Sequence, residues 1–381
     1  MLPTRFCRKV PLLTAVLLCH LLSIGETLTP LLTRPSQDTK KNLLILGFGN
    51  VGKEVASCCS SSKQFQQIYG TIRAKMKHEK TEKDLAGPSS DVIRVPLLQS
   101  ADLSLILPTC NHVLVTIPPP KDPNEMAHLD DVFSEIVNSI PEQSWLGIIS
   151  TTGVYGDHNG SWVDEDSKLL CRENSTASAF QDFESKWQRH VLQCNRGHSL
   201  FIFRCAGIYG PGRSAIHTVF KKGLAVSDQK QEKQNASLTS TTNNNAIRIT
   251  NRIHVRDIAI TIQQAMKWKI AEDESSGCCR VYNLADDLPE SREIVMQYAA
   301  NLLEFIGVPI PRSSQSSNET KSSSARDRRR NSEQKLVKND RMKWELLSGV
   351  GNLMYPTYRE GLRAILIASG TPWSKDEETS T

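Results

Sequence analysis

The chain has 381 residues, enough for one large α/β domain with an appendage or for two ordinary domains. Its formal charge of +5 arises from 46 basic and 41 acidic residues, and part of the excess lies in the arginine-rich run 326–330. Nucleic-acid binding is typically marked by a basic stripe on a folded face, and no such stripe is evident, so we expect no clear nucleic-acid site. An RNA-contacting protein that uses the arginine-rich run stays open as an alternative.

Residues 1–40 differ in composition from the rest and are expected to form a targeting presequence. Basic residues between positions 5 and 9 precede an apolar run, Val10 to Ile24, which is the order of a secretory signal. At about 15 residues this run is shorter than the ~20 that span a bilayer as a helix, so we expect no permanent membrane anchor. An uncleaved anchor and a mitochondrial presequence are the alternatives.

The stretch Thr27 to Lys41 is rich in Ser, Thr and basic residues, as transit peptides are. A signal followed by a transit-like stretch predicts delivery to a plastid enclosed by extra membranes, with the secretory pathway as the alternative.

From Lys41 onward, short apolar runs alternate with longer helical patterns, which predicts βαβ units and a parallel sheet. Helices are expected between the strands, most clearly at Val51 to Ser60, Asp130 to Asn138 and Ala179 to Gln193. The fold class is therefore α/β, a Rossmann doubly wound parallel sheet. Its six expected strands are Asn42 to Leu46, Gln67 to Thr71, Val92 to Val95, His112 to Thr116, Trp145 to Ser150 and Leu200 to Arg204.

Two later segments, 227–245 and 312–339, are almost wholly polar and contain too few apolar residues to offset the entropy of ordering. We predict that both are disordered insertions. Between and after them the chain is expected to form a strand and helix over Arg252 to Trp268, a strand at Arg280 to Leu284, and helices at Ser291 to Ile306 and Thr357 to Ser369.

The first expected strand is followed by a GxGxxG turn and the start of a helix. In this arrangement Gly47 permits a tight turn, Gly49 lets the backbone approach a pyrophosphate, and Gly52 lets the helix pack close to the strand. The phosphates would lie on the free amides at the positive end of the helix. A glycine turn without a ligand is the alternative. The predicted dinucleotide site consists of Gly47, Phe48, Gly49, Asn50, Val51 and Gly52.

The end of the second strand indicates which dinucleotide is preferred. An acidic residue there accepts from a free ribose 2′-hydroxyl, whereas an arginine favours a 2′-phosphate. This chain has Arg73 at that point, with Lys75 and Lys77 close behind and no acid. NADP is therefore the predicted cofactor, with NAD as the alternative if Arg73 is only a solvated charge.

Four further motifs resemble landmarks of the extended short-chain dehydrogenase/reductases, the NAD-dependent epimerase/dehydratase group. The resemblance spans roughly residues 42 to 290. It implies a Rossmann domain over 41–206, a smaller C-terminal substrate-binding region over 207–375, and hydride chemistry on a small sugar-like or other hydroxyl/carbonyl substrate. It leaves the oligomeric state undetermined. The motifs are Ile149 to Asp157, Phe203 to Arg213, Asn251 to Ala259 and Tyr282 to Asp287.

The resemblance also implies catalytic residues. Thr151 matches the position that hydrogen-bonds the substrate oxygen, and Lys186 matches the lysine of the family's TyrxxxLys motif. Asp182 stands where the tyrosine is expected, so the usual proton-transfer group is absent. Tyr155 is a candidate replacement, with a packing role as its alternative, and Lys186 is alternatively a solvated helix residue.

Because it lacks this tyrosine, the chain resembles the atypical members of the group. Arg213, after a Gly-Pro-Gly turn, is a candidate clamp for an anionic substrate group or else an ion-pair partner. Asp164 and Glu165 either contact substrate or lie in a solvated loop, and His254 and Asp257 are expected to stabilise the fold. The cysteine spacing predicts no metal site. The leading hypothesis is an NADP-dependent oxidoreductase or epimerase-like enzyme; the alternative is a catalytically inactive cofactor-binding sensor or assembly factor.

Overall fold

A computed structural model describes residues 41–72, 92–96, 100–120, 122–222, 248–268, 278–310 and 334–370. The expectations for the presequence 1–40, for the insertion 227–245 and for Arg73 lie outside these residues. Most of the second predicted insertion, 312–333, lies outside them as well.

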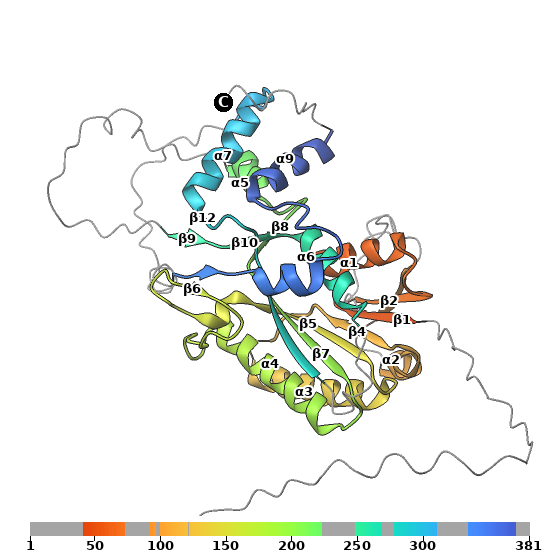
Figure 1. Cartoon of the computed structure of the whole chain (residues 1–381). Coiled ribbons are helices and arrows are strands. Elements are labelled where there is room, and N and C mark those ends of the chain that lie inside the picture. Colours follow the sequence, from red (N-terminus) through yellow and green to blue (C-terminus); the bar gives the residue numbers. More distant parts are fainter. Residues whose placement is uncertain are drawn as a thin grey trace, which may run out of the picture. The chain divides into compact units, whose positions relative to one another are not determined.

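The centre of the fold is a sheet of seven strands in which every neighbouring pair is parallel (Figure 1). Its order is β11-β7-β5-β4-β1-β2-β3. The order reverses between β1 and β4, which is the switch point where ligands bind in doubly wound sheets. The predicted Rossmann-type α/β fold is confirmed. The strands are β1 (Asn42–Leu46), β2 (Gln67–Ile72), β3 (Val92–Pro96), β4 (His112–Val115), β5 (Trp145–Thr151), β7 (Ser199–Cys205) and β11 (Cys278–Leu284).

The strands are apolar on both sides because helices cover both faces of the sheet. In β1, Leu43 and Ile45 enter one buried cluster while Leu44 and Leu46 enter the other. The first cluster lies under α1 (Asn50–Ser61), α6 (Val255–Ala265) and the short π-helix η4 (Met342–Leu347). The second lies under α2 (Ser100–Ile106), η2 (Leu107–Thr109), α3 (Pro123–Ser139) and α4 (Thr176–Gln193).

A third buried cluster joins the later helices, which lie beyond the sheet in Figure 1. They are α5 (Ala215–Lys222), α7 (Arg292–Phe305) and α9 (Tyr358–Ala368). Three pairs of short strands lie outside the main sheet: β8 (Gly207–Tyr209) with β10 (Arg252–His254), β9 (Ile249–Thr250) with β12 (Glu290–Ser291), and β6 (Trp162–Val163) with β13 (Leu336–Val337).

Two features differ from the sequence-based expectations. The strand expected at Arg280 to Leu284 forms as β11, and it joins the central sheet as a seventh strand beside β7, so the part of the chain after residue 206 shares the core of the first part. The prediction of disorder up to residue 339 was wrong at its end, because β13 pairs with β6. The side chain of Asn251 accepts from the Val337 amide at 2.9 Å and donates to the Lys335 carbonyl at 2.9 Å. A polar sequence is thus held by a partner 84 residues away.

Within the described ranges, no helix is long and apolar enough to cross a membrane. The same residues contain no cluster of three His, Cys, Asp or Glu side chains placed to hold a metal ion.

Candidate dinucleotide site

The turn between β1 and α1 has the backbone shape that its glycines allow. Gly47 has φ +96°, a conformation that favours glycine. A Cβ on Gly52 would lie 2.6 Å from the Gly47 carbonyl oxygen, so only glycine lets α1 approach β1 this closely. A Cβ on Gly49 would meet no atom within 4 Å. Gly49 therefore faces open space, as a residue that lies against a ligand must.

Two threonines from neighbouring strands hold this turn. Thr71, at the end of β2, accepts from the Gly47 amide at 2.8 Å, and its carbonyl accepts from the Phe48 amide at 2.8 Å. Thr116, just past β4, donates its hydroxyl to the Gly47 carbonyl. Helix α1 then begins at Asn50 with no side-chain cap, which leaves its first amides available to an anion. The residues at this turn fit a dinucleotide pyrophosphate.

Thr151 ends β5 at the same carboxyl edge of the sheet. Its hydroxyl oxygen accepts from the Gly153 amide at 3.1 Å, at the start of η3 (Thr152–Tyr155), and its side chain is half-buried. The hydroxyl hydrogen can still donate to a ligand oxygen. Thr151 thus lies at the end of β5, and its bond to a substrate oxygen stays a prediction.

Tyr155 lies in an environment unlike that of a proton-transfer group. Its side chain is fully buried, its hydroxyl donates to Asn283 Oδ1 at 2.7 Å, and Arg204 Nη1 donates to the same hydroxyl at 3.0 Å. Burial raises the pKa of Tyr155 above its ordinary value, although Arg204 opposes the rise. A tyrosine acid/base needs access to substrate and a lowered pKa. These contacts match the packing alternative for Tyr155, and its catalytic role stays a prediction.

Lys186 on α4 forms an ion pair with a residue of α3. The start of α4 is the part that meets η3: the Ala177 Cβ is 3.5 Å from the position of a Cβ on Gly153. Lys186 lies nine residues further along, roughly 13 Å down the helix axis at 1.5 Å per residue. Its Nζ is 3.0 Å from Asp130 Oδ2 on α3. The structure thus holds Lys186 in an ion pair between two helices and does not bring it to the predicted site.

A buried ion pair beneath Thr151 was missed by sequence reasoning. Glu184 on α4 accepts from the Ser150 hydroxyl, and Arg204 on β7 donates to both of its carboxylate oxygens, the shortest contact being 2.8 Å. The two side chains are only 4% and 6% exposed. The available signal was an arginine inside an apolar strand and a glutamate beside buried aromatics, because buried charges are normally paired.

Arg213 closes a tight turn that begins at Gly210. The amide of each residue donates to the carbonyl of the other, at 3.0 Å in both cases. Gly212 has φ +74° in this turn, and Arg213 is exposed. Since the segment follows β7 and β8, it lies past the carboxyl end of β7.

The loop residue Glu165 proves to be structural. One carboxylate oxygen accepts from the Asn283 amide at 2.8 Å, and the other lies 3.8 Å from Arg341 Nε. Asp164 bonds to Ser167 within its own loop at 2.7 Å. Glu165 therefore fixes the loop against neighbouring segments, and Asp164 stabilises the loop itself.

His254 caps the start of α6 and Asp257 ties this helix to the segment at Met354, so both stabilise the fold, as expected. His254 Nδ1 accepts from the Arg256 amide at 3.1 Å, and burial lowers its pKa to about 4. Asp257 accepts from the amides of Met354 and Tyr355 at 2.6 and 3.2 Å. Nearby, burial raises the pKa of Asp286 to about 8, against the opposing effect of Arg252.

No family model matches the sequence, and no curated protein matches it. The fold is nevertheless found among solved structures. A conserved protein of unknown function from Silicibacter pomeroyi DSS is 27% identical, with a TM-score of 0.59 over 86% of this chain and 99% of that one. The fold class of the chain is thus shared with known proteins.

Two enzymes solved in complex with NAD are more distant relatives in structure. The dTDP-glucose 4,6-dehydratase of Bacillus anthracis str. Ames is 15% identical, with a TM-score of 0.57 over 89% of this chain and 98% of that one. The UDP-glucuronic acid 4-epimerase of Bacillus cereus is 13% identical, with a TM-score of 0.54 over 85% and 94%. At these identities the likeness concerns the fold alone.

Proposed function

We propose that this protein is a nicotinamide-dinucleotide-dependent oxidoreductase of the epimerase/dehydratase type, acting on a sugar-like or other hydroxyl/carbonyl substrate. The observation that carries the proposal is the turn at Gly47 to Gly52, with an open approach at Gly49 and an uncapped helix behind it. The solved relatives with NAD, whose named substrates are nucleotide sugars, support the same class of chemistry.

Different residues at the carboxyl edge of the sheet would bind the cofactor and the substrate. The amides that begin α1 hold the pyrophosphate, and Thr151 donates its hydroxyl to the substrate oxygen. Arg213, exposed in its glycine turn, binds an anionic group of the substrate. When bound, the dinucleotide supplies a nicotinamide ring that accepts or donates hydride.

We propose NADP as the preferred cofactor, because the residues after β2 include Arg73, Lys75 and Lys77 and no acid up to position 78. Titration of the purified protein with NADPH and NADH by fluorescence tests this preference. We expect NADPH to bind at least tenfold more tightly, and Arg73→Ala to remove the difference. Equal affinities for NADPH and NADH in the unaltered protein would refute the role proposed for Arg73.

A second function is favoured by specific contacts: the protein binds the dinucleotide without turnover, as a sensor or assembly factor. Tyr155 is enclosed and Lys186 is paired with Asp130, so neither supplies the usual acid/base pair. A screen of sugar nucleotides, sugars and simple ketones with bound NADPH separates the two functions. Specific oxidation of the cofactor by any of these substrates would reject the function as a sensor or assembly factor.

For localisation we propose a plastid, on the basis of the signal-like and transit-like stretches within residues 1–40. A fluorescent fusion of residues 1–60 tests this. Fluorescence in the plastid supports the proposal, and fluorescence in the secretory pathway or medium overturns it.

A further inference from the structure

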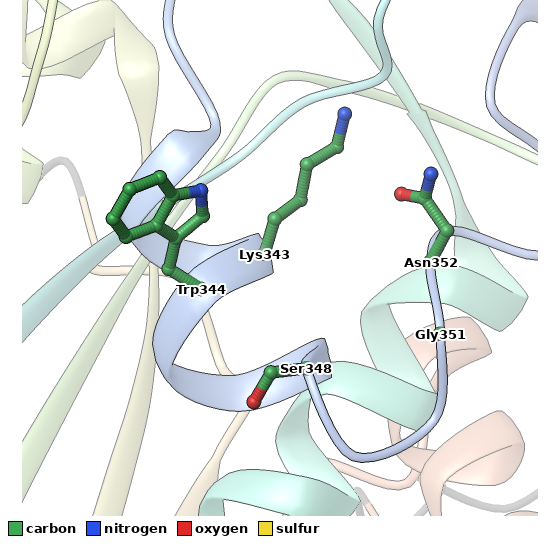
Figure 2. Close-up of a pocket in the computed structure, with 5 residues that line it drawn as sticks. All are labelled: Lys343, Trp344, Ser348, Gly351 and Asn352. Carbon is green, nitrogen blue, oxygen red and sulfur yellow. The ribbon is translucent and has the colours of Figure 1, made fainter.

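A hollow of about 460 Å³ lies on η4 and the segment that follows it. It is lined by Lys343, Trp344, Ser348, Gly351 and Asn352. Figure 2 shows the Trp344 indole standing at one side of the hollow, with Lys343 and Asn352 extending beside it from two different segments. The indole is 81% exposed, although large aromatic side chains are normally well covered.

The backbone that carries these side chains is fixed. On its other face η4 buries Met342, Leu346 and Leu347 in the main core. Glu345 of the same helix accepts from the Tyr282 hydroxyl on β11 at 2.7 Å. The following segment is fixed by Leu353, which is also buried in that core. Trp344 therefore projects from a rigid support, so its exposure is a property of the fold.

Lys343, the charged residue that lines the hollow, is already paired, so the lining favours a neutral ligand. Lys343 Nζ is 2.5 Å from Asp287 Oδ1, so its charge is already balanced. Asn352 uses its side-chain oxygen to accept from the Leu353 amide at 3.0 Å, which leaves its NH₂ group to donate. Ser348 adds a hydroxyl that both donates and accepts. The hollow thus combines a flat apolar face with neutral polar groups at its side.

A pyranose ring has the complementary chemistry, because it presents C–H bonds on its face and hydroxyls around its edge. The volume lies within the range of small-molecule sites, roughly 300–1,000 Å³. We propose that this hollow binds a neutral sugar ring stacked on Trp344, with hydroxyls of the sugar bonded to Asn352 and Ser348. The proposal requires no bound dinucleotide and no hydride transfer, so it is independent of the function proposed above.

Saturation-transfer NMR on the full chain without cofactor tests the proposal, with methyl β-glucopyranoside and methyl β-galactopyranoside as probes and adenosine as a planar comparison. We expect transfer to a glycoside, strongest at the C–H protons of one ring face. Trp344→Ala should weaken binding about tenfold, since aromatic contacts contribute on that scale. Trp344→Phe should keep most of it, and Trp162→Ala, which removes another exposed indole, should leave it unchanged.

Thermal unfolding of each variant should match that of the unaltered protein, because Trp344 is mostly solvent-exposed. Transfer to neither glycoside would overturn the proposal, as would transfer to adenosine alone. Glycoside binding that survives Trp344→Ala would place the sugar elsewhere and overturn it too. NADPH affinity, measured in parallel, reports separately on the dinucleotide site and is expected to be unchanged in every variant.

Discussion

The buried pair of Arg204 and Glu184 gives the sharpest test of the structure. The Glu184 carboxylate is 4% exposed in the unaltered protein, and Arg204→Ala would remove its charged partner. Breaking a buried ion pair from one side costs about 3–5 kcal/mol, so the free energy of unfolding should fall by that amount. Urea unfolding followed by circular dichroism measures the change, provided that the transition stays cooperative.

Two control variants make this test specific. Glu142→Ala removes an ion pair with Arg196 in which the acid is 72% exposed, and it should cost less than about 1 kcal/mol. The double variant Arg204→Met with Glu184→Gln removes both charges and should recover much of the loss. If Arg204→Ala costs no more than Glu142→Ala, the pair does not stabilise this core and the reasoning is refuted.

Three further predictions concern the site and its surroundings. Gly49→Val should leave thermal unfolding nearly unchanged, because the new side chain would enter open space beside the turn. The same side chain should weaken NADPH binding at least tenfold in a titration, and unchanged binding would contradict the placement of the dinucleotide at this turn. Tyr155→Phe should lower the free energy of unfolding by roughly 1–3 kcal/mol because Asn283 loses its donor, without reducing any NADPH oxidation that a substrate screen reveals; abolished turnover would restore a catalytic role. Because folding raises the pKa of Asp286 to about 8, the folded state holds a proton that the unfolded state has lost above about pH 4, so stability should fall by roughly 2 kcal/mol from pH 6.5 to 8. The unfolded-state titration of His254, near pH 6.5, overlaps only the start of this window, and it raises stability there, so it cannot cause the fall. Asp286→Asn should show a flatter profile in thermal unfolding, and an equally steep fall would reject Asp286 as the cause.

The sheet and the glycine turn could be predicted because their signals are local. Apolar runs such as Leu43 to Leu46 are bounded by turn residues, and the spacing of Gly47, Gly49 and Gly52 has a direct steric meaning that the structure bears out. The strand at Leu336 to Val337 was not predictable in this way, because its hydrogen bonds come from β6 and from Asn251, both distant in the sequence.

The candidate catalytic residues show a different limit. Spacing along α4 was used to place Lys186, but the position of a helical residue relative to a site depends on where the helix begins. In the structure α4 begins at Thr176 and lies against α3, and the Lys186 ammonium is 3.0 Å from Asp130 Oδ2 on that helix. Tyr155 has the right residue type at an expected motif, yet only the three-dimensional contacts reveal that Arg204 and Asn283 enclose its hydroxyl.

The contact between α1 and α6 also bears on how the chain folds during synthesis. Gln263 donates to the Cys58 carbonyl across a separation of 205 residues, and Arg256 pairs with Glu54 at 3.0 Å. Loop closure over such distances is slow, and a nascent chain emerges from its N-terminus first. The helix of the proposed cofactor turn therefore keeps an apolar face uncovered until most of the protein has been made. We expect a shortened chain that ends at Cys205 to aggregate during expression.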